Sequence, residues 1–600
     1  MSRAPRRPVS AMEVRQRGEV HDVVVIGSGA SGAMAAHTLV EHGVRVLMID
    51  AGWKFDRGLS WAHVLPFEAD RRLQEGDRPQ RFRLDTREQP YLTPEGRPFD
   101  HYRTQGRHMK RLRLSGVALI AAATLAACSG APEPVEITMT NGQGEIAGEV
   151  TATSVILQTR LTSNAGWVDG DLPGVDGVAR FEVATGPDFA DAIATDWLTA
   201  TVETDHIVKA KIDGLSPGTE YLYRVVYGPD PEHTESGPTR SFATHPGADA
   251  TARTSFTVVT GMNYHQFYDN PNRAYTGPDK ELGFPGLASM LALEPDFFVA
   301  TGDNVYYDAP YEGRADTAPT MRRKWHQQLS KQRFIDFFTD TPTYWEKDDH
   351  DYRYNDCDNT SDAAPLPDLG RRMFLEQVPI VDPNDPDPVT YRTHRVSRDL
   401  QIWLVEGRDY RSPNMMEPGP GKTLWGEEQL AWFKRTLAES DATFKILISP
   451  TPMVGPDDAN QAGRAAENHD PVKRDNHSNP GGFRHERDEL FDWLIENGFL
   501  EKNFYIVTGD RHWQYHSLDP TGFEEFSTGA LVDANSRVGR PPGDPDSNDP
   551  NALVMQYYTY DEPTGGFLNV VVTPGDPATA AFRFYDEQGE LLYEDVKTAN

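Results

Sequence analysis

The sequence is poor in cysteine and in positive charge. Only two cysteines occur in 600 residues, which excludes a disulfide framework and a four-cysteine zinc module. Lysine and arginine number 59 against 91 aspartates and glutamates, so the formal net charge is −32. Because nucleic-acid recognition starts from a basic surface, this deficit argues against a nucleic-acid-binding protein. The 38% hydrophobic and 25% charged residues are typical of a globular protein, and the length predicts several domains.

One apolar run, residues 114–127, is too short for an ordinary membrane-spanning helix, which needs about 20 residues. It follows the basic segment 109–113 (MKRLR), and it ends at residues 125–128 (LAAC), which look like a bacterial lipobox. A basic start, a short apolar run and small residues are the order of a secretory signal. We therefore expect Cys128 to carry a lipid anchor, and the protein to be exported to the periplasm or cell surface of a bacterium. The alternative is a buried alanine-rich helix.

The negative charge is unevenly distributed along the chain. Residues 1–108 contain 17 basic and 14 acidic residues, whereas residues 109–600 contain 42 and 77. Such a shift indicates two segments with different origins or roles. Because a secretory signal acts at an N-terminus, we favour Met109 as the start of the exported protein. The alternative is that residues 109–128 form an internal apolar helix.

Residues 22–50 carry a nucleotide-binding pattern. A β-branched strand at 22–26 precedes the loop 27–32 (GSGASG), a helix to about residue 42 and a strand at 44–49. In this pattern a first glycine permits the tight turn, a second lets the backbone approach a pyrophosphate, and a third allows close helix packing. An acid after the second strand is placed for a ribose hydroxyl. The residues in these roles are Gly27, Gly29, Gly32 and Asp50. The pattern predicts a Rossmann-like βαβ fragment.

This segment resembles the start of the glucose–methanol–choline oxidoreductases, which bind FAD. The resemblance covers about 20–107, and neither a substrate domain nor a catalytic histidine region follows before residue 109. One βαβ unit cannot bury both of its faces. We interpret 1–108 as a truncated FAD-binding-like fragment that would bind FAD only if it were functional. An FAD-dependent oxidoreductase is the alternative.

Residues 129–134 are a proline-containing tether. Short strands separated by turns follow at 154–161, 179–184, 206–212 and 221–227, and they predict a β-sandwich like a fibronectin type III module over 135–247. From 250 to 600 strands alternate with helices, which predicts an α/β domain. Its strands are expected at 255–260, 297–301, 401–405, 444–449 and 504–508. Its helices are expected at 283–293, 318–338, 426–439 and 485–497.

Polar clusters follow the expected strands of the α/β part, where open sheets bind their ligands. Asp303 and Tyr306 come after the strand 297–301. An aspartate there can bridge two metals and a tyrosine can supply a phenolate, and such hard oxygen ligands suit iron(III), calcium or manganese. A capped turn is the alternative.

The second cluster is the segment 347–351 (KDDHD). We expect Asp349 to ligate a metal and His350 to protonate a leaving group or steady a phosphoryl oxygen. A solvated acidic loop is the alternative.

The third cluster follows the strand 504–508. Asp510 and His512 can both face one centre as metal ligands, while a turn with a surface histidine is the alternative. We leave His516, four residues further on, out of the predicted ligand set.

Together these clusters resemble the PhoD-like alkaline phosphatases of the metallophosphoesterase superfamily. The family motifs GDxxY and GDxH match residues 302–306 and 509–512, and WDDH[ED] matches residues 348–351 after its tryptophan. Residues 406–411 (EGRDYR) look like its D-x-R-x-x-R segment with Glu406 in place of the aspartate. The resemblance spans about 145–600, and it implies a metallophosphoesterase α/β sandwich, a mixed iron–calcium centre and phosphate ester substrates.

Two further positions depart from the family pattern. The family usually carries Ser-Cys-Gln after its first strand, with the cysteine on iron, whereas residues 261–263 here are GMN. Either Asn263 or His265 is expected to replace the missing ligand, or the iron site is remodelled. Lys347 stands where the family has tryptophan, and it could alter the charge of the pocket. These departures leave the identity of the metals open.

The sequence thus predicts a phosphoesterase that hydrolyses small phosphomonoesters or diesters with metal-activated water. His350 would assist the leaving alkoxide, and Arg408 or Arg411 would pair with the substrate phosphate. The negative charge disfavours polyanionic substrates and nucleic acid. Besides the oxidoreductase, an inactive surface-anchored binding protein remains an alternative.

Overall fold

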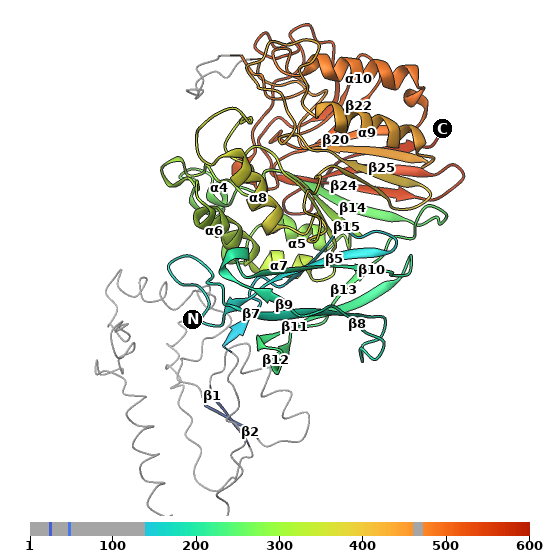
Figure 1. The fold of residues 1–600 in the computed structure, drawn as a ribbon. Helices are drawn as coiled ribbons and strands as arrows, with labels where there is room; N and C mark the ends of the chain where they lie inside the picture. Colours follow the sequence, from blue (N-terminus) through green and yellow to red (C-terminus); the bar gives the residue numbers. More distant parts are fainter. Residues whose placement is uncertain (1–22, 27–45, 50–137, 460–471) are drawn as a thin grey trace, which may run out of the picture. The chain divides into compact units, whose positions relative to one another are not determined.

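The computed structural model describes residues 23–26, 46–49, 138–459 and 472–600 (Figure 1). The chain divides into two compact units, Met1–Glu133 and Pro134–Asn600. In the first, β1 (Val23–Ile26) pairs in parallel with β2 (Val46–Ile49), near the expected strands. The predicted FAD-contacting residues and the predicted anchor lie outside the described residues, so their roles stay predictions; they are Gly27, Gly29, Gly32, Asp50 and Cys128.

The described part of the second unit begins with eleven strands. They are β3 (Met139–Thr140), β4 (Glu145–Gly148), β5 (Ser154–Arg160), β6 (Thr162–Ser163), β7 (Gly177–Ala184), β8 (Ile193–Ala194), β9 (Leu198–Ala200), β10 (Ile207–Asp213), β11 (Glu220–Asp230), β12 (His233–Ser236) and β13 (Arg240–Ala243). One sheet has the order β12-β11-β7-β8, with β13 and β9 attached, and β10-β5-β4 belong to another. Side chains of β5, β7, β10 and β11 share one buried cluster, so the two sheets pack face to face as a sandwich. Its likeness to fibronectin type III stays a prediction.

The sandwich is continuous with the α/β part of the chain, because β4 pairs in parallel with β16 (Thr343–Glu346) through Gly148 and Thr343. The resulting nine-stranded sheet has the order β10-β5-β4-β16-β15-β14-β24-β25-β26. Its remaining strands are β14 (Thr254–Val259), β15 (Phe297–Thr301), β24 (Gly566–Thr573), β25 (Thr579–Asp586) and β26 (Leu591–Thr598). One sheet therefore runs across the expected boundary at 247–250.

A seven-stranded sheet, β17-β18-β19-β20-β22-β21-β23, forms the other half of the α/β part. Its strands are β17 (Arg392–Arg395), β18 (Leu400–Leu404), β19 (Phe444–Ser449), β20 (Phe504–Thr508), β21 (Gln514–Leu518), β22 (Glu524–Thr528) and β23 (Met555–Thr559). Phe256, Val299, Ile402, Ile448 and Phe526 belong to one buried cluster drawn from both sheets. The two sheets thus pack face to face around a central apolar core.

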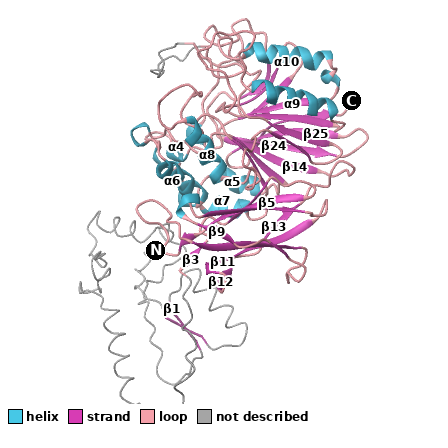
Figure 2. Ribbon diagram, in the orientation of Figure 1, coloured by secondary structure: helices cyan, strands magenta, loops and turns pink. Residues whose placement is uncertain are grey.

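Helices cover the outer faces of both sheets (Figures 1 and 2). The helices are α4 (Tyr264–Asp269), α5 (Pro285–Leu291), α6 (Ala318–Leu329), α7 (Gln332–Phe338), α8 (Pro367–Gln377), α9 (Gly426–Glu439) and α10 (Arg484–Glu496). Short 3₁₀ turns lie at η1 (Val202–Thr204), η2 (Lys280–Leu282), η3 (Tyr311–Gly313), η4 (Phe499–Glu501) and η5 (Asp533–Asn535). Helices α5 to α8 share a core with β15 and β16, and α9 and α10 share one with β18 to β20. The described part of the chain holds no helix with both the length and the apolar character of a membrane span.

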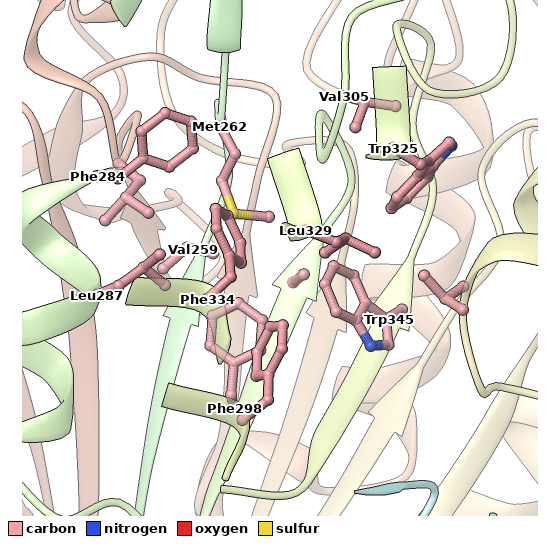
Figure 3. Close-up of a cluster of buried hydrophobic side chains, with 14 of the residues drawn as sticks. Val259, Met262, Phe284, Leu287, Phe298, Val305, Trp325, Leu329, Phe334 and Trp345 are labelled. Carbon is pink, nitrogen blue, oxygen red and sulfur yellow. The ribbon is translucent and has the colours of Figure 1, made fainter. Parts of the chain in front are cut away.

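The expected helix over 318–338 is two helices in the structure. The chain leaves helical geometry at Lys331, whose ψ of 139° is extended, and α7 restarts one residue later. The break lets Trp325 and Leu329 of α6 and Phe334 of α7 enter the same apolar cluster (Figure 3).

Candidate metal centre

The strand-end clusters converge on one cavity of about 470 Å³. All six predicted metal ligands and the predicted acid line it: Asn263, Asp303, Tyr306, Asp349, His350, Asp510 and His512. They follow β14, β15, β16 and β20, and the parallel pairing of β14 with β15 and of β15 with β16 places their carboxyl ends at one edge. This is the edge at which an α/β sheet binds ligands.

Two glycines let the loops approach one another. A Cβ on Gly302 would lie 2.5 Å from the Asp348 backbone nitrogen, and one on Gly509 would lie 2.3 Å from Oγ1 of Thr301. Both distances are shorter than atoms tolerate, so each position requires glycine. The following aspartates, Asp303 and Asp510, have φ of 56° and 60°. Left-handed backbone in non-glycine residues is concentrated at functional sites.

Asp303 is the centre of the hydrogen-bond network. Its Oδ2 accepts from the Tyr306 hydroxyl at 2.6 Å and lies 3.0 Å from His512 Nε2. Its Oδ1 is buried and has no hydrogen-bond partner among the described residues. Burial raises the pKa of Asp303 well above its usual range, although the positive charge of His350 opposes this. A buried carboxylate oxygen without a donor requires a cation or a proton.

Asp349 lies beside Asp303. Its Oδ1 accepts from the His350 backbone N–H at 2.8 Å, and its Oδ2 accepts from that of Asp356 at 2.6 Å. Burial acts to raise the pKa of Asp349, but the positive charges of His350 and Arg408 outweigh it and the pKa is lowered. Asp349 therefore stays ionised and able to bind a cation.

Among the described residues, three groups of acidic and imidazole side chains are compact enough to hold an ion. The group of His516, Glu524 and Asp595 has no member on the cavity wall, whereas the other two groups do. One of these two is Asp303, Asp349 and His350, and the other is Asp349, Asp356 and Asp475; within each group the ligand atoms lie within 4.8 Å of one another. These donors are carboxylate oxygens and imidazole nitrogens. They fit hard or borderline divalent ions, and the unpartnered Asp303 oxygen supports that fit.

His350 is held by a residue that the sequence did not single out. Its Nδ1 lies 2.7 Å from Oδ1 of Asp308, and its ring stacks on Tyr306 with centroids 4.2 Å apart. Burial opposes the charge on the imidazole, yet the carboxylates of Asp308, Asp349 and Asp303 raise its pKa well above the usual range. The other oxygen of Asp308 accepts from the Asn355 backbone N–H at 3.0 Å. The loop after β15, which carries Asp308, and the loop after β16, which carries His350 and Asn355, therefore hold the Asp308–His350 pair in place.

Arg408 and Arg411 lie beneath the cavity and do not line it. Arg408 donates to Asp348 and makes two hydrogen bonds to Asp475, at 2.9 and 3.0 Å. Arg411 donates to the same Asp475 at 2.7 Å. Although burial acts to raise the pKa of Asp475, the two guanidinium groups hold it well below the usual range. This placement differs from the expected contact with a substrate phosphate, because buried carboxylates already engage both arginines.

A family model described as PhoD-like phosphatase matches residues 256–557. The chain belongs to the PhoD-like phosphatases. A model for the N-terminal domain of the same family matches residues 129–246, and an FAD binding domain model matches residues 22–91. The first two matches confirm the expected resemblance to the PhoD-like phosphatases, and the third confirms an FAD-binding resemblance near the N-terminus. The glucose–methanol–choline family stays a prediction. As a PhoD-like phosphatase, the chain is a metal-dependent phosphoesterase.

Among solved structures, a PhoD structure has a TM-score of 0.59 and 19% identity, covering 78% of this chain and 90% of that one. This likeness supports the fold of the second unit. A purple acid phosphatase from yellow lupin (Lupinus luteus) seeds has a TM-score of 0.49 and 12% identity, covering 77% of this chain and 74% of its own. No curated protein matches the chain.

Two departures from the PhoD-like motifs contact each other. The Nζ of Lys347 lies 2.6 Å from Oε2 of Glu406 and 2.9 Å from Oδ1 of Asp409, and all three side chains are buried. Burial opposes ionisation of Glu406, but the Lys347 charge outweighs it and lowers the pKa. The lysine therefore neutralises carboxylates beneath the site and does not line the cavity.

In the third departure, residues 261–263, one side chain lies in the apolar core and another lines the cavity. Met262 is fully buried in an apolar cluster with Phe284 and Leu287 (Figure 3). Asn263 lines the cavity, but its Oδ1 caps α4 by accepting from the Gln266 N–H at 3.0 Å. His265 lies 3.4 Å from Asp269 and does not line the cavity. The replacement ligand expected at Asn263 stays a prediction.

The sequence missed several residues of the cavity wall, among them Asp308, Asp356, Lys473, Asn535 and Arg537. Asn535 donates to the Tyr306 hydroxyl at 2.9 Å. Asn535 is the last residue of η5 and the other four lie in loops, and none of the five directly follows a strand. Asp308 had one available signal, its position two residues after Tyr306. His516, which lies 2.6 Å from Glu524, is outside the cavity lining.

Proposed function

We propose that the cavity hydrolyses small phosphate esters with two or more ions held by Asp303, Tyr306, Asp349, Asp510 and His512. The observation that carries this proposal is the unpartnered, buried Oδ1 of Asp303 at the point where the strand-end loops meet. Divalent ions there would polarise the phosphoryl group and make a water molecule acidic. Iron and calcium are the identities that the motif resemblance suggests.

His350 is the proton donor of the proposal. Asp308 keeps its Nδ1 occupied at 2.7 Å, which leaves Nε2 as the ring atom that can give a proton to a leaving alkoxide. The stacked Tyr306 ring fixes the plane of the imidazole. Asp308 is thus a positioning residue for His350.

Small esters are the proposed substrates because six aspartates line the cavity wall: Asp303, Asp308, Asp349, Asp356, Asp458 and Asp510. This wall and the net charge of −32 would repel a polyanion. No nucleic-acid partner is proposed.

Substitution of Asp303 tests the catalytic proposal. We expect Asp303→Asn to abolish hydrolysis of p-nitrophenyl phosphate, because the amide removes a negative charge and a metal ligand, and to lower the metal content of the purified protein. The exposed Asp362 supplies the matched control, Asp362→Asn, which should keep full activity. Full activity in a folded Asp303→Asn protein would refute the assignment.

We further propose that a lipid on Cys128 anchors the exported protein to a membrane, on the basis of the basic, apolar and LAAC segments at 109–128. Mass spectrometry of the native product is the test. A lipid-modified N-terminal Cys128 is expected, and peptides from residues 1–108 in the mature protein would contradict the proposal.

The FAD-binding match over 22–91 supports a second candidate, an oxidoreductase. Flavin absorbance in the purified full chain would favour the oxidoreductase, and a colourless protein with phosphoesterase activity would rule it out.

A further inference from the structure

Lys473 and Arg537 are the lysine and arginine side chains that the described structure places on the cavity wall. The Nζ of Lys473 is paired with the buried Asp457, and its side chain is 12% exposed. The Arg537 side chain is 41% exposed, and Oδ2 of Asp458, at 3.9 Å, is the nearest carboxylate oxygen among the described residues. Its charge is therefore less neutralised than that of Lys473.

The Arg537 guanidinium is held in place next to the metal centre. Its backbone N–H donates to the carbonyl of His512 at 2.9 Å. Its guanidinium carbon lies 4.7 Å from the ring centroid of Trp513, which is 1% exposed. A Cβ on Gly539 would lie 2.1 Å from Trp513 Nε1, so this segment runs directly against the indole. The stacking limits the motion of the side chain before any ligand arrives.

Binding of an anionic ester in this cavity requires a positively charged side chain such as Arg537. The cavity wall carries six aspartates, and an anionic ester approaching them requires positive charge beyond the ions that those aspartates hold. Arg408 and Arg411 cannot supply it, because Asp348 and Asp475 engage them below the cavity. A guanidinium presents a planar fork that matches two phosphoryl oxygens.

We propose that Arg537 binds the non-bridging oxygens of the substrate phosphoryl group and of product phosphate, and so favours phosphomonoesters over diesters. A monoester dianion carries two negative charges on these oxygens and a diester anion carries one, so the guanidinium charge stabilises a bound monoester more. This inference rests on the proposed phosphoesterase function.

The test is the Arg537→Ala variant of the full chain. Its KM for p-nitrophenyl phosphate and its inhibition constant for inorganic phosphate should rise roughly 10- to 100-fold, as expected for the loss of charge-assisted hydrogen bonds. Its kcat should change less, and its KM for bis-p-nitrophenyl phosphate should rise less. Added guanidinium ion should restore part of the phosphate affinity.

Arg540→Ala is the matched control. Arg540 lies three residues away, lines only the neighbouring cavity of about 370 Å³, and is paired with Asp458 and Asp544. Its removal should change these constants by about twofold or less, as for an exposed ion pair. A second variant, Arg537→Lys, keeps the charge without the fork and should give intermediate constants.

The outcomes separate the two proposals. An active wild type with unchanged KM and phosphate inhibition in Arg537→Ala would overturn the role of Arg537 and leave the phosphoesterase in place. If KM and the phosphate inhibition constant rose equally in Arg537→Ala and Arg540→Ala, a general disturbance of this segment would explain both changes. That result would also overturn the role of Arg537. A wild type that hydrolyses neither ester would refute the proposed function itself.

Discussion

At the scale of single residues, the contact between Asp308 and His350, which lie on two different loops, is the one most open to a test. If His350 donates a proton to the leaving group, the benefit depends on how poor that leaving group is. We expect Asp308→Asn to lower kcat for an alkyl phosphate roughly 10- to 100-fold, part of the usual contribution of general acid catalysis. The loss for p-nitrophenyl phosphate should be much smaller, because p-nitrophenolate leaves without a proton.

The measurement is kcat across a series of esters whose alcohols differ in pKa, with Asp362→Asn as the control. A steeper dependence on leaving-group pKa in Asp308→Asn is the expected result. An equal loss for every ester would show that Asp308 only supports the fold.

Individual residues were predictable where a strand end marked them. Asp303, Asp349 and Asp510 each follow a buried strand, and all line the cavity. The burial of Arg408 was not predictable, because its partner Asp475 lies 67 residues further along the chain. Nothing local indicates that an arginine near a strand end points into the protein.

Glu149, directly after β4, joins elements that are far apart in sequence. Its oxygens accept from Nε and Nη2 of Arg392 at 2.9 and 2.6 Å, and Oε2 lies 2.9 Å from Nε2 of His394. Burial acts to raise the pKa of Glu149, but the charges of Arg392 and His394 outweigh it and lower the pKa. These contacts connect the sandwich to β17 of the seven-stranded sheet.

Removing this carboxylate should destabilise the second unit. We expect Glu149→Gln to lower the free energy of unfolding at pH 7 by about 3–5 kcal/mol, since a buried arginine loses its counter-ion. A lowered folded-state pKa means that the stabilisation is present above the unfolded pKa and is lost as the pH falls through the folded pKa. The difference between wild type and variant should therefore shrink in acid.

Urea unfolding at pH 7 and at pH 4 measures this difference, and Glu220→Gln on the exposed side of β11 is the control. An equal difference at both pH values would contradict the role assigned to the ionised Glu149.

At the element scale, β15, β19, β20 and α9 have the bounds that the sequence predicted. Unbroken apolar runs in the strands and a clear helical period in α9 made these bounds predictable from the sequence. The pairing of β4 with β16 was not predictable, because Gly148 and Thr343 meet across 195 residues and neither carries a signal for the other.

At the scale of the whole molecule, the acidic charge of the chain has a local counterpart in the six aspartates of the cavity wall. Like charges this close raise one another's free energy, and bound cations relieve that cost. The requirement for metal thus follows from the same carboxylates that the strand ends bring together. The FAD-binding match lies in the other unit of the chain.

The central claim is that this carboxylate cluster hydrolyses phosphate esters through bound metal. The most direct measurement is the rate of p-nitrophenyl phosphate hydrolysis by the full chain, together with its metal content, before chelation, after chelation and after return of iron, calcium or manganese. The account predicts that activity falls to background with the metal and returns with it. Undiminished hydrolysis by a metal-free, folded protein would contradict it.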